Sequence, residues 1–149
     1  MKRNRFCHGA SLLRDYGKEP LVINMDHAAK INSNYRIALW TGEYLQVTLM
    51  SIPVGGDIGL EVHPDTDQFL RIEKGHGISV MGRERGSLTQ RRRVGENDAI
   101  IVPAGTWHNV INKGREEMKL YSIYAPPHHP FGTVHPTKED GERGESESV

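Results

Sequence analysis

The sequence of 149 residues contains one cysteine and no long apolar run. Because a disulfide needs two cysteines, Cys7 cannot form one within the chain, which is typical of a reducing compartment. No stretch approaches the roughly 20 apolar residues that span a bilayer. No apolar run follows the basic opening residues, so no signal peptide is expected. These absences predict a cytoplasmic protein without a membrane partner, in which Cys7 is an ordinary surface thiol.

An excess of charge of either sign is also absent. Lysine and arginine together number 19, as do aspartate and glutamate, so the formal net charge is zero. This balance gives no support to the binding of nucleic acid or of other polyanions, and no helix pair of a DNA-binding motif is visible. We therefore expect a partner that is a small molecule.

Long segments with a helical period are missing as well. Short runs rich in Val, Ile, Leu and Tyr alternate with Gly and Pro from Tyr35 onward, which indicates an all-β domain. Nine short strands of this kind suit a sandwich or a barrel. The predicted strands cover residues 36–41, 44–52, 58–63, 67–74, 77–82, 87–93, 98–102, 107–112 and 117–124.

The polar ends of the chain are expected to add little to the core of one domain. We predict an N-terminal arm over residues 1–35, a barrel over residues 36–125 and a C-terminal segment over residues 126–149. Three prolines within residues 126–130 exclude a central strand or a helix there, so this part is interpreted as a strap over the barrel. The charged stretch from Lys138 onward has almost no apolar residue and predicts a disordered tail.

The stretch GLEVHPDTDQFLRIEKG, from Gly59 to Gly75, carries polar residues in a β pattern. Residues two apart on a strand face the same side, so Glu61 and His63 are expected to project together. A turn at Pro64 would bring Gln68, on the apolar face of the next strand, alongside them. An inward amide without a partner costs about 1 to 3 kcal/mol, and a metal ion is one candidate partner.

A second stretch, GENDAIIVPAGTWHNVIN, runs from Gly95 to Asn112. A predicted buried strand leads into Pro103 and Gly105, where proline fixes one dihedral angle and glycine permits a left-handed one. His108 follows this sharp turn, and Asn112 is expected to satisfy backbone groups in the next turn. The spacing PxG, two residues, H, three residues, N resembles the second motif of the cupin family.

The first stretch resembles the first cupin motif, which runs G, HxH, a carboxylate or amide after three or four residues, and G. His63, Gln68 and Gly75 match it, with Gly55 or Gly56 as the first glycine. The sequence departs from the motif at Glu61, where the first histidine is usual, and at Gln68, where glutamate is usual. The likeness extends over residues 36–125 and implies a double-stranded β-helix, the jelly-roll barrel of the cupins.

The resemblance also implies a divalent ion with Glu61, His63, Gln68 and His108 as ligands. The carboxylate lost at position 68 is regained at position 61, so two imidazoles and one carboxylate remain. Such a set with open positions suits Fe(II) and would also hold Mn(II) or Zn(II), and nickel is a further candidate. Gln68 could instead hydrogen-bond a ligand residue or water, and loss of the metal, known in some cupin barrels, is an alternative.

Two functions are consistent with this resemblance. One is a metal-dependent enzyme acting on a small molecule, either a dioxygenase-like oxidoreductase or an isomerase like the mannose 6-phosphate isomerase type. The alternative is a non-catalytic barrel that binds a small ligand. The isomerase would need a second base and a phosphate clamp, for which Arg71, Arg92 and the distal histidines are candidates, although Arg71 is expected to face outward. The substrate depends on cavity shape and cannot be inferred from a motif.

The roles of four further histidines stay open at this point: His27, His128, His129 and His135. The last three belong to the predicted strap, and one of the four could close over the barrel mouth and act as an acid or a base. A homodimer is also expected, because open barrels have edge strands that are usually covered. The arm before Tyr35 could add to the sheet of a partner.

Overall fold

The computed structural model describes the backbone of residues 13–147 and the side chains of residues 13–144. Cys7 and the first twelve residues of the predicted arm lie outside the described residues. The elements are α1 (Met25–Ile31), β1 (Arg36–Thr41), β2 (Gln46–Ile52), β3 (Asp67–Lys74), β4 (His76–Gly82), β5 (Gln90–Gly95), β6 (Ala99–Val102), β7 (Trp107–Asn112), β8 (Met118–Ala125), β9 (Val134–His135) and α2 (Lys138–Glu147).

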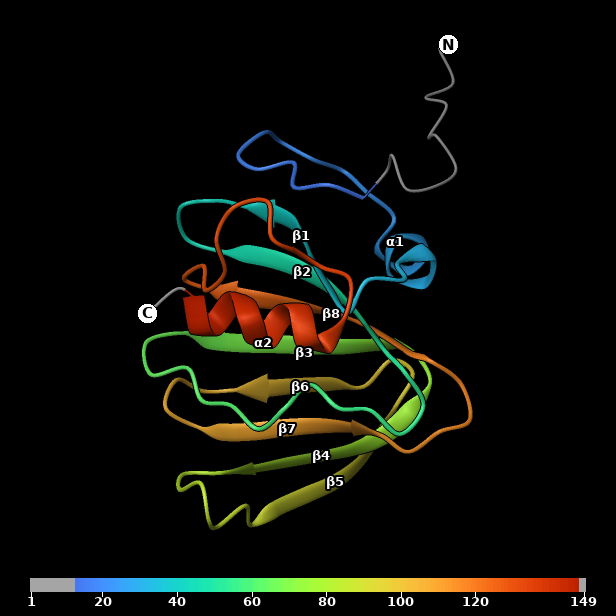
Figure 1. Cartoon of the computed structure of the whole chain (residues 1–149), viewed down its shortest axis with the longest axis vertical. Helices are drawn as coiled ribbons and strands as arrows, with labels where there is room; N and C mark the ends of the chain where they lie inside the picture. Colours follow the sequence, from blue (N-terminus) through green and yellow to red (C-terminus); the bar gives the residue numbers. More distant parts are fainter. Residues whose placement is uncertain (1–12, 148–149) are drawn as a thin grey trace.

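The strands form two antiparallel sheets (Figure 1). The larger sheet has the order β6-β3-β8-β2-β1-β9, and the smaller sheet has the order β5-β4-β7. Apolar side chains from both sheets, such as Met50, Leu70 and Leu120 from the larger one and Val110 from the smaller one, meet in one buried cluster. The predicted all-β class is confirmed, and the core lies between the two sheets.

The alternation predicted for β3 is confirmed by burial. Gln68, Leu70 and Ile72 are each at most 2% exposed, whereas Phe69 and Arg71 on the opposite face are partly exposed. Residues of period two place one face of the strand in the core. Gln68 therefore enters the barrel interior with the two aliphatic residues.

The predicted strand over residues 58–63 is wrong. This segment pairs with β7 only at isolated bridges, from Asp57 to Ile111 and from Glu61 to His108. Gly59 has a φ of +87°, a conformation that breaks the pleat of a strand and that glycine adopts without steric cost. The segment is therefore an extended loop beside β7.

Helix α1 covers the outer face of the larger sheet. Ala28 and Ala29 pack there against Leu49, which alternates along β2 with the inward Met50. The helix begins after Asn24, whose Oδ1 accepts a hydrogen bond of 2.9 Å from the backbone N–H of His27. This part of the predicted arm is thus packed on the barrel.

The predicted disorder from Lys138 onward is wrong for α2. Thr137 caps this helix: its Oγ1 accepts a hydrogen bond of 3.2 Å from the N–H of Asp140, and Asp140 Oδ2 accepts one of 3.1 Å from the N–H of Thr137. This reciprocal pair is a capping box, for which the sequence Thr-Lys-Glu-Asp is a signal. In Figure 1, α2 passes in front of β3 and β8. Neither described helix has the length and the apolar character to cross a membrane.

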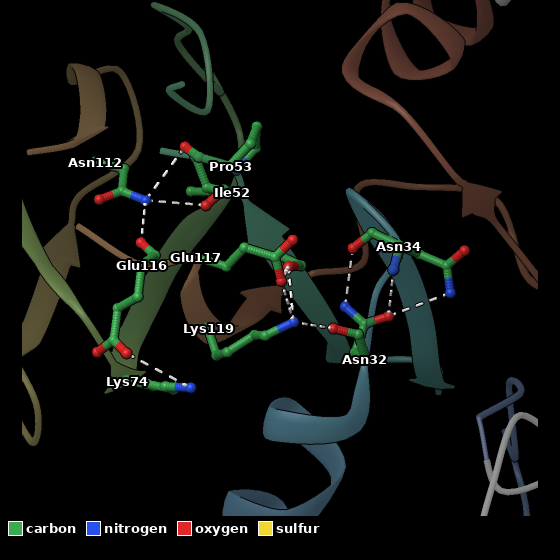
Figure 2. Close-up of polar contacts among 10 residues, drawn as sticks. Asn32, Asn34, Ile52, Pro53, Lys74, Asn112, Glu116, Glu117 and Lys119 are labelled. Atoms are coloured by element: carbon green, nitrogen blue, oxygen red, sulfur yellow. Dashed lines mark hydrogen bonds and ion pairs between the residues drawn. The ribbon is translucent and has the colours of Figure 1, made fainter. Parts of the chain in front are cut away.

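A buried polar cluster at Asn112 and Lys119 joins loops and strands (Figure 2). Asn112 Nδ2 donates to the carbonyl oxygens of Ile52, Pro53 and Glu116 at 3.0, 3.2 and 2.9 Å, and its Oδ1 accepts from the N–H of Gly114 at 2.9 Å. Lys119 Nζ donates to Asn32 O at 2.6 Å and to Ser51 Oγ at 2.9 Å, and lies 3.0 Å from Glu117 Oε2. The backbone-satisfying role expected of Asn112 is confirmed.

Candidate metal centre

Backbone hydrogen bonds join the two sequence stretches that carry the predicted ligands. The N–H of Glu61 donates to His108 O at 3.1 Å, and the N–H of His108 donates to Glu61 O at 2.9 Å. The N–H of Gly105, which has a φ of +80°, donates to His63 O at 2.9 Å. The turn at Pro103 to Gly105 therefore brings His108 beside Glu61 and His63.

The side chains of Glu61, His63 and His108 converge on one point. Their potential ligand atoms all lie within 4.8 Å of one another. Glu61 Oε1 is 3.3 Å from His63 Nε2 and 3.4 Å from His108 Nε2. Ligands about 2.1 Å from a common ion are about 3 Å apart, so this spacing suits a single ion.

The polar atoms of these histidines are buried without hydrogen bonds that would use them. His63 is 4% exposed and His108 is 1% exposed. Within the described part of the chain, both ring nitrogens of His63 and Nε2 of His108 have no hydrogen-bond partner. His108 Nδ1 lies 3.0 Å from the carbonyl oxygen of Thr106, which holds the proton on Nδ1 and leaves the lone pair of Nε2 toward the cluster. The donor set therefore fits a divalent cation.

Glu61 is ionised at neutral pH. Burial opposes its ionisation, but His108, His63 and the charge of Arg36 outweigh burial and hold the pKa of the Glu61 carboxyl well below its usual range. A carboxylate must be deprotonated to bind a metal ion. Glu61 is thus in the protonation state that a ligand requires.

Gln68 is inward, but no described hydrogen bond joins it to the other three predicted ligands. Its side chain lies on β3 and is 2% exposed. Gln68 Nε2 donates to Ser122 Oγ at 3.3 Å, and Oε1 has no partner among the described residues. The structure therefore brings three of the four predicted ligands together, and ligation by Gln68 stays a prediction.

Three of the open histidines line the cavity beside this cluster. The cavity has a volume of about 390 Å³ and is lined by Glu61 and His63 together with His128, His129 and His135. The ring centroids of His63 and His128 are 4.0 Å apart. His27 is exposed on α1, which packs on the outer face of the larger sheet. Three histidines of the predicted strap therefore line the wall of this cavity, and a role for one of them as an acid or a base stays a prediction.

Gln46, which motif reasoning missed, holds this strap in place. Its side chain is fully buried. Its Oε1 accepts from the N–H groups of His128 and His129 at 3.3 and 2.9 Å, and its Nε2 donates to His129 O at 2.9 Å. The alternation of β2, which places Gln46 on the same face as Met50, is the signal that could have identified it as an inward residue.

The strap histidines are neutral at neutral pH. Desolvation, with a contribution from His63, lowers the pKa of His128 to about 4. Burial, with a contribution from Arg36, lowers the pKa of His129 to about 2. A neutral imidazole keeps one N–H and one lone pair for hydrogen bonding. The cavity wall thus offers uncharged donors and acceptors close to the three converging side chains.

Comparison with known proteins agrees with this geometry. Residues 48–124, more than half of the chain, match the family model of the cupin domain. The protein belongs to the cupin family. The uncharacterized protein YrkC of Bacillus subtilis is 61% identical to this cupin over 129 residues, which are 87% of this chain and 69% of YrkC.

Solved structures resemble the whole barrel. The crystal structure of BH2720 from Bacillus halodurans is similar with a TM-score of 0.87 and 54% identity, covering 88% of this cupin and 99% of BH2720. An uncharacterized conserved protein with a double-stranded β-helix domain from Klebsiella pneumoniae has a TM-score of 0.61 and 18% identity, covering 80% of this cupin and all of that chain. The second likeness concerns the fold alone. Both agree with a double-stranded β-helix.

Proposed function

We propose that this cupin is a divalent-metal-dependent enzyme acting on a small molecule. Glu61, His63 and His108 hold the ion, and Gln68 completes or orients the shell. The observation that carries the proposal is the convergence of three buried donor atoms within 4.8 Å of one another beside a cavity of about 390 Å³. Buried polar groups without partners are uncommon in native proteins, and a cation bound by Nε2 of each histidine would give these two atoms a partner.

The donor set favours iron. Two imidazoles and one carboxylate with open positions are typical of non-haem Fe(II) sites, and Mn(II), Zn(II) and Ni(II) are the competing ions. An ion of this kind supplies Lewis acidity and, as Fe(II), activation of dioxygen. The residues of the chain hold the ion and orient its ligands. Glu61 contributes negative charge, Thr106 fixes the ring of His108, and the strap restricts the access of water.

The two arginines that the sequence offered for a sugar-phosphate isomerase lie away from the cavity. The isomerase would need a cationic clamp in the cavity. Arg71 lies on the outer face of β3, where its guanidinium donates to Asn97 Oδ1 at 3.2 Å, and Arg92 is exposed on β5. Neither of the two lines the cavity. Arg71 and Arg92 therefore do not supply this clamp, and an isomerase would have to use other groups of the cavity wall.

Metal analysis of the purified protein tests the proposal. We expect one equivalent of metal in the wild type after reconstitution with Fe(II), Mn(II), Zn(II) or Ni(II), and substoichiometric metal in Glu61→Ala and His108→Ala. His76→Ala is the matched control, because His76 is an exposed histidine at the start of β4. A wild type that holds no stoichiometric metal after reconstitution would sink the proposal. Stoichiometric metal without turnover of any substrate would support the ligand-binding alternative.

Two substitutions of Gln68 test its place in the shell. Gln68→Leu should lower the metal affinity about tenfold, the effect of losing a weak ligand or an orienting group. Gln68→Glu should raise the affinity, because a carboxylate is a stronger ligand than an amide. Equal affinities for both variants and the wild type would show that Gln68 lies outside the shell.

A homodimer is a further part of this proposal. Strand β6 is an edge of the larger sheet, and Ile101 on it is 66% exposed. An open edge with an exposed apolar side chain is usually covered by another chain or segment. Sedimentation at micromolar concentration should show a dimer, and a monomer would contradict this expectation.

A further inference from the structure

The strap forms one wall of the cavity, and this wall holds a buried polar atom, His129 Nε2, that is not part of the candidate metal centre. His129 is 7% exposed and lines the cavity. Its Nε2 has no hydrogen-bond partner among the residues that the structure describes. A buried group of this kind carries a free-energy cost unless a ligand or water satisfies it. His129 Nε2 is therefore a candidate contact for a molecule in the cavity.

The strap and two strands place His129, His135 and Arg36 in one group. Gln46 fixes the backbone of His129 from both sides: the N–H of His129 donates to Gln46 Oε1, and Gln46 Nε2 donates to His129 O, each at 2.9 Å. His135 lies on β9 directly opposite Arg36 on β1. An Arg36 guanidinium nitrogen lies 3.4 Å from His135 Nδ1, and the rings of His129 and His135 have centroids 6.4 Å apart. The pairing of β1 with β9 thus positions Arg36 and His135, and the hydrogen bonds of Gln46 position His129.

Arg36 places a positive charge beside His129 and His135. Arg36 is 2% exposed, and a guanidinium is always charged in proteins. Arg36 lines a second, smaller cavity of about 110 Å³. Glu61 lines both this cavity and the one that holds His129. Besides burial, the charge of Arg36 lowers the pKa of both His129 and His135. The Arg36 charge that disfavours an imidazolium favours a bound anion, and it acts against the negative charge of Glu61, which raises the pKa of His129.

We propose that His129, His135 and Arg36 form an anion subsite, so that the ligand of this cupin is a small organic acid. Its carboxylate is bound at this subsite, and a second oxygen group lies at the metal centre. The contact between the second oxygen group and the metal ion rests on the metal site proposed above. The contact with the carboxylate depends on His129, His135 and Arg36, and none of these is a predicted metal ligand.

Calorimetric titration of the metal-loaded protein tests the two-point contact. The probes are malonate, succinate and glutarate, with acetate and azide as small anions that can occupy only one point. We expect one of the three dicarboxylates to bind about tenfold more tightly than acetate, the ratio that one added charge-assisted hydrogen bond provides. His129→Phe should remove this advantage and leave azide binding and metal content unchanged. His76→Phe is the control at an exposed histidine.

Two results would overturn the inference. One is that no dicarboxylate binds more tightly than acetate, and the other is that His129→Phe weakens azide and dicarboxylate binding equally. If His129→Phe fails to fold, His129→Gln replaces it in the test, because glutamine keeps a hydrogen-bonding side chain. The His129→Gln variant should retain more of the dicarboxylate affinity than any apolar variant at this position that does fold.

Measurements on the metal-free protein separate this inference from the metal proposal. Succinate at millimolar concentration should shift the ring ¹⁵N resonances of His129 and His135, but not that of the exposed His76. This result supports the subsite even if the protein proves to bind no metal. Absence of these shifts in both the metal-free and the metal-loaded protein would overturn the subsite, whatever the metal content.

Discussion

The cluster around Asn112 and the candidate metal centre around Glu61 are both buried and polar, and both involve β7. Asn112 uses its amide fully, donating to three carbonyl oxygens and accepting from one N–H. In contrast, His63 has both ring nitrogens buried without a hydrogen-bond partner in the described part of the chain. The satisfied cluster joins loops to strands, whereas the unsatisfied one keeps its lone pairs for a ligand.

This contrast distinguishes two consequences of substitution. Removing a group from the satisfied cluster leaves its partners buried without hydrogen bonds, which lowers the free energy of unfolding. Removing a group from the unsatisfied cluster leaves few hydrogen bonds broken, so the loss appears mainly in ligand binding. The following predictions test this distinction, in order of decreasing expected effect.

Metal addition should give the largest change. An ion at a thousandfold excess over its Kd should raise the free energy of unfolding of the wild type by about 4 kcal/mol, because it binds the folded state alone. Glu61→Gln should show almost none of this gain, since the carboxylate ligand is lost. Chemical denaturation with and without metal measures both values. An equal gain in the wild type and in Glu61→Gln would place the ion elsewhere.

Asn112→Ala should lower the free energy of unfolding by about 3 kcal/mol, because several buried backbone groups lose their partner together. Asn34→Ala is the matched control visible in Figure 2: among the described residues, Asn34 Nδ2 donates to Asn32 Oδ1 alone, at 3.2 Å. This control should cost less than about 1 kcal/mol. Denaturant melts give both values, and metal affinity should be the same in both variants. Similar losses of stability would contradict the special role of Asn112.

Acidification should destabilise the metal-free protein through His129. The pKa of His129 is lowered to about 2 from an ordinary value of 6.5, so between these values the unfolded state binds a proton that the folded state does not. Stability therefore falls as the pH drops below 6.5, by up to about 1.4 kcal/mol per pH unit for one such proton.

Urea melts from pH 7 to pH 5 measure this slope. His129→Phe should make it shallower by up to one proton, whereas His76→Phe should leave it unchanged. An unchanged slope in His129→Phe would show that the imidazole is not held neutral by the fold.

Gly144→Ala should give the smallest effect. Alanine favours a helix over glycine by about 1 kcal/mol. However, a Cβ at Gly144 would lie 3.0 Å from His135 Nε2, and this close contact should offset the gain. Glu139→Ala, at an exposed position of α2, is the control for helix propensity. Amide hydrogen exchange in α2 should be no slower in Gly144→Ala than in the wild type, and markedly slower exchange would show that α2 is not docked on His135.

Much of the barrel and of the metal centre follows from local patterns. Alternation along β3 correctly placed Gln68, Leu70 and Ile72 in the interior, since the side-chain period of a strand is a local property. The resemblance of the two stretches to the cupin motifs likewise implied that His108 would join Glu61 and His63, and the structure brings the three side chains together. The predicted strand at 58–63 failed because Gly59 adopts a positive φ, which the composition of the segment did not reveal. The prediction of a disordered tail was wrong for α2 because Thr137 and Asp140 cap the start of this helix.

The sequence by itself indicated the cupin barrel and, through the family resemblance, the ligand set Glu61, His63 and His108, because each motif is defined by residue types and spacings within one short stretch. The tertiary structure alone decided the opposite wall of the cavity. Gln46, His129, His135 and Arg36 come from β2, the strap, β9 and β1, and no local period relates them. The order of strands in the larger sheet and the hydrogen bonds of one buried amide bring these four residues together.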